Sequence, residues 1–294
     1  MMLKDVLKGG EKFVSGHRSC AGCAFPIIVR TILSATDNPI VVSCATGCLE
    51  VTSTIYPYSS WKVPFIHNAF ENASATMNGV ISAYKSLKKK EKNVKFVVFG
   101  GDGGTYDIGL QSLSGALERG EDFVYVCYDN EAYMNTGIQR SSATPKGAVT
   151  TTCPAGKVEW RKDLTKIAIA HNVKYVAQAS PFNILDLAKK AKKAFETKGP
   201  SVLVVLSPCP LGWRSKTNMS IEISRLATKT NFWPLYEYEN GKYTINFNNN
   251  TPLPITKFLE TQGRFKKLLS DKKLVDEVQK KVNERWEELK KLST

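Results

Sequence analysis

The sequence predicts an α/β protein with an open, mostly parallel sheet and helices on both faces, followed by a C-terminal hairpin and a helical extension. Apolar runs alternate with amphipathic segments from about residue 39 to residue 206, as in successive βαβ units. Polar or glycine-rich turns follow several of these runs, and the rhythm changes after Trp213. A chain of 294 residues can bury a sizeable core. We therefore expect a main domain, residues 1–213, and an extension, residues 214–294, that packs on the core or on partner subunits.

The N-terminal part contributes the first elements of this pattern. After a polar lead-in, residues 1–15, a helix is expected over residues 24–34 and a strand over residues 39–43. We expect a loop before a long helix over residues 68–87, with His67 capping that helix. Small residues on this helix indicate close packing against a neighbour.

The central βαβ unit surrounds the turn Gly100-Gly101-Asp102-Gly103-Gly104. Residues 94–99 form an apolar run before it, and residues 111–120 read as a helix that ends at a glycine. A second apolar run, residues 123–127, leads to Tyr128-Asp129-Asn130-Glu131-Ala132. Because ligands of open α/β sheets bind at the carboxyl ends of strands, we expect both turns to form one site.

The remaining elements continue the α/β rhythm and then leave it. A helix, a strand, a helix and a strand are expected over residues 163–172, 173–177, 183–197 and 201–206. Past Trp213, the pattern predicts a hairpin over residues 236–245 with the turn Asn240-Gly241, a loop over 248–254 and an amphipathic helix over 271–292.

The chemistry of the central unit predicts a magnesium diphosphate site. Glycines allow the backbone to approach phosphate oxygens, and the start of a helix offers free N–H groups. Asp102 offers a carboxylate oxygen, Asn130 an amide oxygen and Ala132 a backbone carbonyl, which suit Mg²⁺. A lone Gly-Asp-Gly turn is weak evidence, but Asn130 follows Asp102 by 28 residues and both follow apolar strands.

The seven cysteines predict a metal or cluster site rather than disulfides, because their number is odd and no secretory signal precedes them. Cys20 and Cys23 form a CxxC turn before a helix, and Cys48 and Cys209 follow predicted strands. Four thiolates suit either a [4Fe–4S] cluster or tetrahedral zinc, so ligand chemistry alone leaves both open. The other three are a rival to Cys48, a core residue and a loop residue without an assigned role: Cys44, Cys127 and Cys153.

The net charge of +14 indicates either a solvated lysine-rich surface or an acidic partner. Lysine runs occur at residues 88–90, 266–267 and 290–291, without a nucleic-acid-binding motif. No apolar run is long enough to span a bilayer, and no leader with a cleavage site is present. We therefore expect a cytoplasmic protein that binds neither nucleic acid nor membranes.

At this point the sequence resembles a known family. Gly-Asp-Gly, 26 further residues and an asparagine resemble the thiamine diphosphate (ThDP) motif. The longer segment resembles the beta subunit of pyruvate:ferredoxin oxidoreductases, within the 2-oxoacid:ferredoxin oxidoreductases; it reads GGDGGTYDIGLQSLSGALERGEDFVYVCYDNEAYMNTGIQRS. The resemblance extends from about Gly16 to Trp213, with a weaker match at residues 261–265.

The resemblance implies roles for individual residues. Asn135 would hydrogen-bond the substrate or intermediate; the alternative is a turn residue ahead of Gly137. Asp102, Asn130 and Ala132 would hold Mg²⁺ and, with it, ThDP. Further cofactor contacts would come from Gly47, Gly101, Gly103, Gly104 and Thr136. The proximal [4Fe–4S] cluster would be held by Cys20, Cys23, Cys48 and Cys209. Ala24 departs from the glycine expected after the CxxC, which weakens the assignment of the substrate.

The resemblance also implies an activity: pyruvate, coenzyme A and oxidised ferredoxin react reversibly to acetyl-CoA, CO₂ and reduced ferredoxin. No glutamate can be assigned to activation of the ThDP pyrimidine, and no further cluster motifs are present. Partner subunits of the alpha, gamma and delta types would supply both, so this subunit would be inactive alone.

Three alternatives stay open. The same machinery could act on oxalate, 2-oxoisovalerate or 2-oxoglutarate. The chain could instead be a ThDP decarboxylase or carboligase with a structural zinc. A third alternative is a non-enzymatic, zinc-bound basic interaction module, although this leaves the pairing of Asp102 with Asn130 unexplained.

Overall fold

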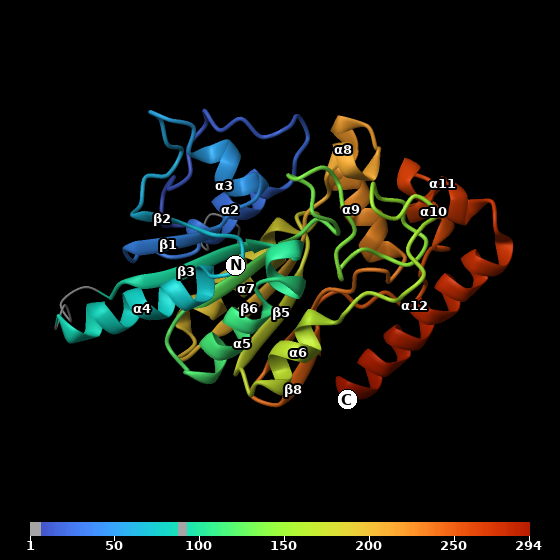
Figure 1. The fold of residues 1–294 in the computed structure, drawn as a ribbon. Coiled ribbons are helices and arrows are strands. Elements are labelled where there is room, and N and C mark those ends of the chain that lie inside the picture. Colours follow the sequence, from blue (N-terminus) through green and yellow to red (C-terminus); the bar gives the residue numbers. More distant parts are fainter. Residues whose placement is uncertain (1–6, 88–92) are drawn as a thin grey trace.

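A single eight-stranded sheet organises the protein in the computed structural model, which describes residues 7–87 and 93–294 (Figure 1). The lysine run at 88–90 and the start of the polar lead-in lie outside the described residues. The strand order is β2-β1-β3-β4-β6-β5-β7-β8, in which the first six strands are parallel and the last two antiparallel. The predicted mostly parallel sheet is therefore confirmed. The strands, in chain order, are β1 Ile40–Ala45, β2 Phe65–Asn68, β3 Lys95–Gly101, β4 Val124–Asp129, β5 Tyr175–Ala179, β6 Ser201–Leu206, β7 Tyr236–Glu239 and β8 Lys242–Ile245.

Helices cover both faces of this sheet, which explains why β4 and β6 are buried along their whole length. One face packs against α2 (Phe25–Leu33) and α7 (Ile184–Glu196). The other packs against α4 (Ala73–Ser86), α5 (Leu110–Glu118) and α6 (Leu164–Ala170). The predicted three-layer arrangement is present, with helix boundaries that differ from the predictions by a few residues.

One predicted boundary is wrong. Residues 65–68 form the edge strand β2, paired in parallel with β1, and α4 begins only at Ala73. His67 therefore caps no helix: its Nε2 lies 2.9 Å from Oγ1 of Thr46. A four-residue strand with one buried residue has too little alternation to be recognised from the sequence.

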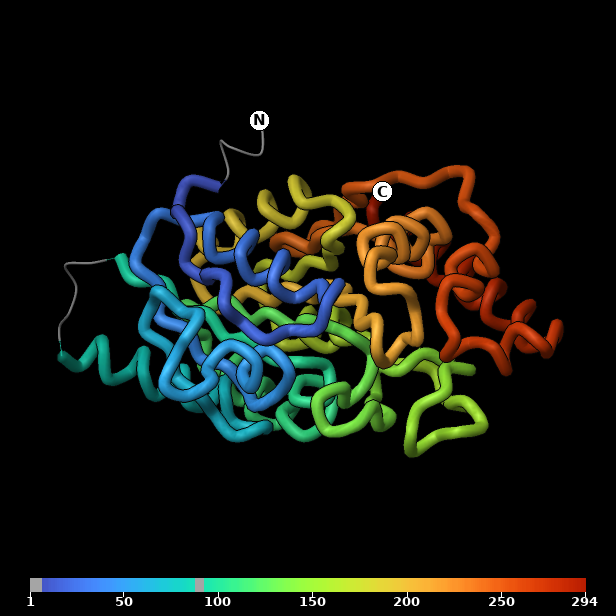
Figure 2. The backbone as a smooth tube through the Cα atoms, turned by 90° about the horizontal axis from the view of Figure 1, so that it is seen from above, coloured from blue at the N-terminus to red at the C-terminus, as the bar shows by residue number. Residues whose placement is uncertain are grey.

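The segment after Trp213 lies at the end of the sheet opposite β2 (Figure 2). Its hairpin β7–β8 turns at Asn240-Gly241, as predicted, and both turn residues have positive φ, 48° and 91°. Side chains of this segment, among them Phe258 and Leu268, share one hydrophobic core with Val98 of β3. The extension thus packs on the main domain; the boundary at residue 213 stays a prediction. Its helices are α9 Ser220–Lys229, α10 Thr256–Leu259, α11 Lys266–Leu269 and α12 Lys272–Leu292.

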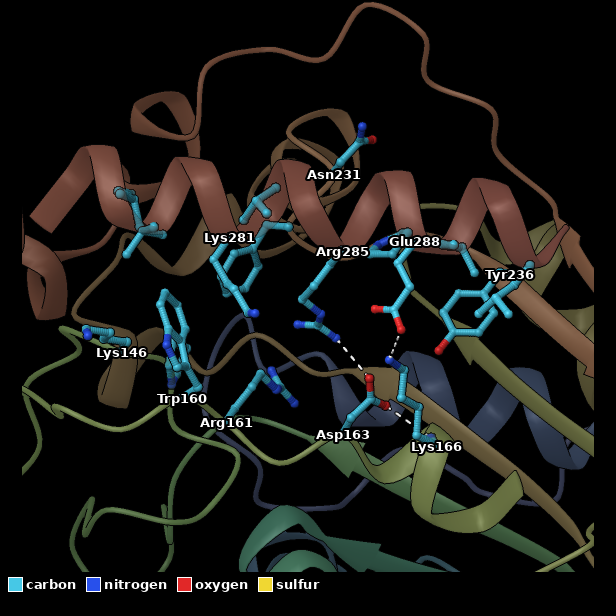
Figure 3. A pocket seen from close by; sticks show the side chains of 18 of the residues that line it. Lys146, Trp160, Arg161, Asp163, Lys166, Asn231, Tyr236, Lys281, Arg285 and Glu288 are labelled. Atoms are coloured by element: carbon cyan, nitrogen blue, oxygen red, sulfur yellow. Dashed lines mark hydrogen bonds and ion pairs between the residues drawn. The ribbon is translucent and has the colours of Figure 1, made fainter. Parts of the chain in front are cut away.

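Helix α12 lies across a cavity of about 70 Å³ (Figure 3). Its predicted apolar stripe is buried at Val278, Val282, Trp286 and Leu289. Two ion pairs bridge it to the body, Arg285 to Asp163 at 3.3 Å and Lys166 to Glu288 at 2.6 Å. No helix of the described part of the chain has both the length and the apolar character needed to cross a membrane.

Candidate functional site

The candidate site lies at the carboxyl ends of the neighbouring strands β1, β3 and β4, where a cavity of about 280 Å³ opens. Glycine, carboxylate, amide and thiol groups meet there because parallel strands end at the same edge. All nine residues predicted to bind the cofactor or substrate line this one cavity, together with Cys48: Gly47, Gly101, Asp102, Gly103, Gly104, Asn130, Ala132, Asn135 and Thr136. The structure thus brings together residues separated by almost 90 positions.

Glycines in the cavity wall permit close approach of neighbouring groups. A Cβ at Gly103 would lie 2.6 Å from the ring of Tyr133, and one at Gly104 would lie 3.0 Å from the carbonyl oxygen of Phe70. Residues Gly103–Asp107 form one π-helical turn whose start no side chain caps. Uncapped N–H groups at the start of a helical turn suit phosphate oxygens.

Three groups that carry oxygens converge beside this turn. The side-chain amide of Asn130 donates its nitrogen to the carbonyl oxygen of Ala132 at 2.8 Å and to Oδ1 of Asp102 at 2.8 Å. With the amide turned over, its oxygen would take the same place. Mg²⁺ binds oxygens at about 2.0–2.1 Å in an octahedron, which places adjacent ligand oxygens about 2.9 Å apart. The spacing of the three oxygens therefore fits the predicted Mg²⁺ ligands.

A loop after β4 holds the other oxygen of Asp102. Oγ of Ser141 donates to Oδ2 of Asp102 at 2.5 Å, and Oγ1 of Thr144 donates to the carbonyl oxygen of Glu131 at 2.7 Å. Burial and the nearby Asp129 raise the pKa of the Asp102 carboxyl well above its usual range, against the effect of Ser141. A bound divalent cation would favour the carboxylate form.

Lys157 anchors this loop through hydrogen bonds to its backbone. Its buried ammonium donates to three backbone carbonyls, those of Ser141 and Ser142 at 3.2 Å and that of Thr144 at 2.7 Å. Burial lowers the pKa of Lys157 to about 8. Ser141, Thr144 and Lys157 are functional candidates that the sequence analysis missed, because a polar loop carries no periodic pattern.

A buried ion-pair network supports residues 130–144, the loop after β4 that carries the predicted Mg²⁺ ligands Asn130 and Ala132 and is called the metal loop below. Glu131 has φ 70° and is fully buried; its Oε1 accepts from Arg161 at 2.7 Å and its Oε2 from Arg264 at 2.5 Å. Arg161 also pairs with Asp129, which accepts a second hydrogen bond from Tyr106 at 2.6 Å. Two carboxylates and two guanidinium groups thus compensate one another in the core, where unpaired charges would be costly.

The four predicted cysteine ligands lie close together. Burial raises the pKa values of Cys23, Cys48 and Cys209, and neighbouring thiols of the set raise each of them further. Cys20 acts in this way on all three. The four thiols therefore lie in one region of the fold, and their role as one ligand set stays a prediction.

The kind of centre that these thiols would hold stays a prediction. Tetrahedral zinc needs sulfurs about 2.3 Å from the ion and hence about 3.8 Å from one another. Among the described residues, no group of three or more His, Cys, Asp or Glu is arranged to hold a metal ion.

The CxxC loop is fixed against the segment that follows β6. Gly22 has φ 77°, and a Cβ there would lie 1.8 Å from the carbonyl oxygen of Thr217. Oγ of Ser220 donates to the carbonyl oxygen of Gly22 at 2.5 Å. Glycine is therefore required at position 22, both for the backbone conformation and for this contact.

Cys48 joins the cysteine set to the cavity, because it belongs to the cavity wall. A side-chain hydrogen bond from Asn135 opposes the effect of burial, which raises the pKa of Cys48 to about 12. Cys44, the rival to Cys48, is fully buried in β1, and Cys127 lies in the core as predicted. Cys153 is half-buried and has no assigned role.

Comparisons with known proteins agree with this geometry. Residues 45–205 match the family described as thiamine pyrophosphate enzyme, C-terminal TPP binding domain. The pyruvate synthase subunit PorB of Thermotoga maritima is 51% identical over 93% of this chain and 90% of its own. PorB of Methanocaldococcus jannaschii is 46% identical, covering 94% and 95%. The ketoisovalerate oxidoreductase subunit VorB of Pyrococcus abyssi is 45% identical, covering 96% and 94%.

Among solved structures, a 2-oxoglutarate:ferredoxin oxidoreductase from Magnetococcus marinus superposes with a TM-score of 0.57. It is 23% identical and covers 76% of this chain and 80% of its own, so it supports the fold alone. The resemblance found in the motifs is thus confirmed over nearly the whole chain. This chain belongs to the thiamine pyrophosphate enzymes and, among them, to the PorB and VorB subunits of 2-oxoacid oxidoreductases.

Proposed function

We propose that this chain is the subunit of a pyruvate:ferredoxin oxidoreductase that binds ThDP, Mg²⁺ and the proximal [4Fe–4S] cluster. The complex would convert pyruvate, coenzyme A and oxidised ferredoxin to acetyl-CoA, CO₂ and reduced ferredoxin, reversibly, in the cytoplasm. One observation carries the proposal. The predicted diphosphate-binding residues and one predicted cluster ligand, Cys48, line the same cavity.

Residues of the cavity receive separate roles. Asp102, Asn130 and the carbonyl of Ala132 hold Mg²⁺, which is supported by the 2.8 Å distances from the Asn130 amide to the other two groups. Gly47, Gly101, Gly103, Gly104 and Thr136 surround the diphosphate. Asn135 directs its amide toward the substrate. ThDP, when bound, supplies an electron sink for decarboxylation of a 2-oxoacid.

Cys20, Cys23, Cys48 and Cys209 hold the cluster that accepts electrons one at a time. The position of Cys48 supports this assignment, because this proposed cluster ligand lines the same cavity as the proposed substrate-binding amide of Asn135. Electrons leaving the substrate would then have a short path to the cluster.

Pyruvate is the proposed substrate because the two PorB relatives, 51% and 46% identical, are named pyruvate synthase subunits. The VorB relative, 45% identical, keeps 2-oxoisovalerate as the second candidate. Oxalate and 2-oxoglutarate remain test substrates. Partner subunits of the alpha, gamma and delta types would supply the pyrimidine-binding glutamate and further clusters, and ferredoxin would accept the electrons.

The test is anaerobic purification of the native complex, followed by iron, sulfide, zinc and thiamine assays and a 2-oxoacid panel with ferredoxin reduction as readout. We expect about four irons per copy of this chain beyond those of the partner subunits, bound ThDP, and the highest kcat/KM with pyruvate. Zinc without iron would instead support a decarboxylase or carboligase. Absence of metal and thiamine would overturn both readings.

A further inference from the structure

We propose that Trp213 and Arg264 couple the metal loop to Cys209, so that binding of Mg²⁺–ThDP and occupancy of the cysteine cluster strengthen each other. This inference rests on the proposed function. It concerns two positioning residues that lie outside the cavity and contact both halves of the site.

The short helix α8 (Pro210–Trp213) forms the first half of the link. Cys209 precedes the helix, and its Sγ accepts from the N–H of Gly212 at 3.4 Å. At the other end, the indole Nε1 of Trp213 donates to the carbonyl oxygen of Asn130 at 2.7 Å. The backbone N–H of Trp213 donates in turn to the carbonyl oxygen of Cys209 at 2.8 Å. One helical turn therefore joins the thiol-bearing residue to the backbone of a proposed Mg²⁺ ligand.

Arg264 forms the second half. Its guanidinium group stacks on the ring of Trp213 at 4.0 Å and donates to Oε2 of Glu131 at 2.5 Å, beside Asn130 in the metal loop. Gln262 fixes the guanidinium orientation by accepting from Nε at 3.0 Å and from Nη2 at 2.7 Å. The helices on which these contacts depend, α8 to α11, lie together on one side of the molecule (Figure 1).

Both linking residues are packed in the core. Trp213 is 0% and Arg264 2% exposed, so neither can move without displacing packed neighbours. A shift of Cys209 is thus transmitted to Asn130 and Glu131, and the reverse holds as well.

Coupling of this kind is reciprocal and measurable by a double-mutant cycle. Cys20→Ser removes a cluster ligand at the exposed end of the set and leaves Cys209, Trp213 and Arg264 in place. Trp213→Phe keeps a ring for Arg264 to stack on but deletes the hydrogen bond to Asn130. The readout is the equilibrium Kd of ThDP at saturating Mg²⁺, measured on the whole complex, with iron content as a second readout.

The matched control is Trp233→Phe. Trp233 also lies buried, donates Nε1 to a backbone carbonyl at 2.8 Å and lies under an arginine, Arg161, at 5.0 Å. Its acceptor, however, is the carbonyl of Ala179 at the end of β5, two strands from β4 in the strand order. Arg161 itself donates to Glu131, so this variant also disturbs a tryptophan–arginine pair beside Glu131 but leaves the hydrogen bond to Asn130 intact. A loss of packing common to buried tryptophans would therefore appear equally in both variants.

We expect Cys20→Ser to weaken ThDP binding about tenfold in the wild-type and Trp233→Phe backgrounds, but less than about twofold in the Trp213→Phe background. Arg264→Lys, which keeps the charge but loses the paired donors, should also reduce the coupling. The same effect of Cys20→Ser in all backgrounds, or none in the wild type, would overturn the inference. A wild-type complex without iron or without ThDP binding would instead refute the proposed function.

Discussion

Two regions of the molecule place charged groups around a cavity. The charged side chains are buried in one region and largely exposed in the other. At the carboxyl ends of β1, β3 and β4, Asp102 and Glu131 are 0% exposed and Arg264 is 2% exposed. Under α12, the side chains of Lys166 and Glu288 are 51% and 53% exposed, and their ion pair lies beside that of Arg285 with Asp163 (Figure 3).

The difference shows that the buried charges lie around the proposed functional site, whereas the charges under α12 form exposed pairs. Burying a charge is costly unless every group has a partner, so the network around Glu131 must be built with accurate geometry. Exposed pairs carry no such requirement and contribute little. If this comparison is correct, substitutions at the first cavity should abolish ligand binding, whereas those at the second should change stability only slightly.

The largest expected effect comes from Asp102→Ala. Removing this carboxylate takes away the single anionic group of the three that converge, so Mg²⁺-dependent ThDP binding should be lost. The four thiols stay in place, and the cluster should still form, weakened by no more than about tenfold through the proposed coupling. Equilibrium binding of ThDP with and without Mg²⁺ tests this on the complex. The exposed Asp276 on α12 provides the control, Asp276→Ala. Retained Mg²⁺-dependent affinity in Asp102→Ala would count against the site.

Cys209→Ser should come next, with loss or strong weakening of the cluster. Serine is a much poorer iron ligand than a thiolate, and Cys209 is the ligand contributed by the segment after β6. Cys153→Ser is the matched control, because that half-buried thiol lies outside the ligand set. Iron and sulfide analysis and the visible spectrum measure the result; equal iron in both variants would refute the assignment.

Ser141→Ala should weaken Mg²⁺ binding by about 10–100-fold, as is usual when a residue that orients a metal ligand is removed. The hydroxyl of Ser141 donates to Oδ2 of Asp102, whereas Oδ1 is the oxygen beside Asn130. The adjacent Ser142, which contributes backbone groups to the loop, provides the control Ser142→Ala. Titration of ThDP binding with Mg²⁺ distinguishes the two; equal Mg²⁺ dependence in both would contradict the role of Ser141.

The pH dependence of stability should depend on Lys157. Its pKa is lowered by burial to about 8 in the folded protein, whereas an unfolded lysine has about 10.4. Between these values the unfolded state binds more protons, so the free energy of unfolding rises with pH. Relative to Lys157→Met, the wild type should gain on the order of 2 kcal/mol from pH 8 to pH 10.5. Denaturant unfolding at several pH values measures this; a difference independent of pH would contradict it.

The smallest effect is expected at the second cavity. Glu288→Gln should lower the free energy of unfolding by no more than about 1 kcal/mol, because its partner Lys166 is half exposed. Trp286→Ala, in the buried stripe of the same helix, should cost about 3–5 kcal/mol. Thermal or denaturant unfolding compares the two, and a larger loss for Glu288→Gln would invalidate the contrast between the two cavities.

Sequence reasoning recovered the site where local chemistry and strand ends coincide. Asp102, Asn130, Asn135 and Cys48 follow apolar strands or glycine turns, and all lie in the predicted cavity. The same reasoning missed β2, because a four-residue strand with one buried residue carries no usable period. It also missed Arg161, since a single arginine in a polar loop looks like any solvated residue.

The sequence by itself determined the mostly parallel α/β fold, because apolar runs of strand length alternate with amphipathic helices. It also determined the Asp102–Asn130 pairing and the candidate thiols, because these follow from turn chemistry at strand ends. Only the tertiary structure decided which groups support them. Arg264 reaches Glu131 across 133 positions, and Trp213 reaches Asn130 across 83. Such contacts depend on how the extension folds back over the sheet, and no local pattern encodes that path.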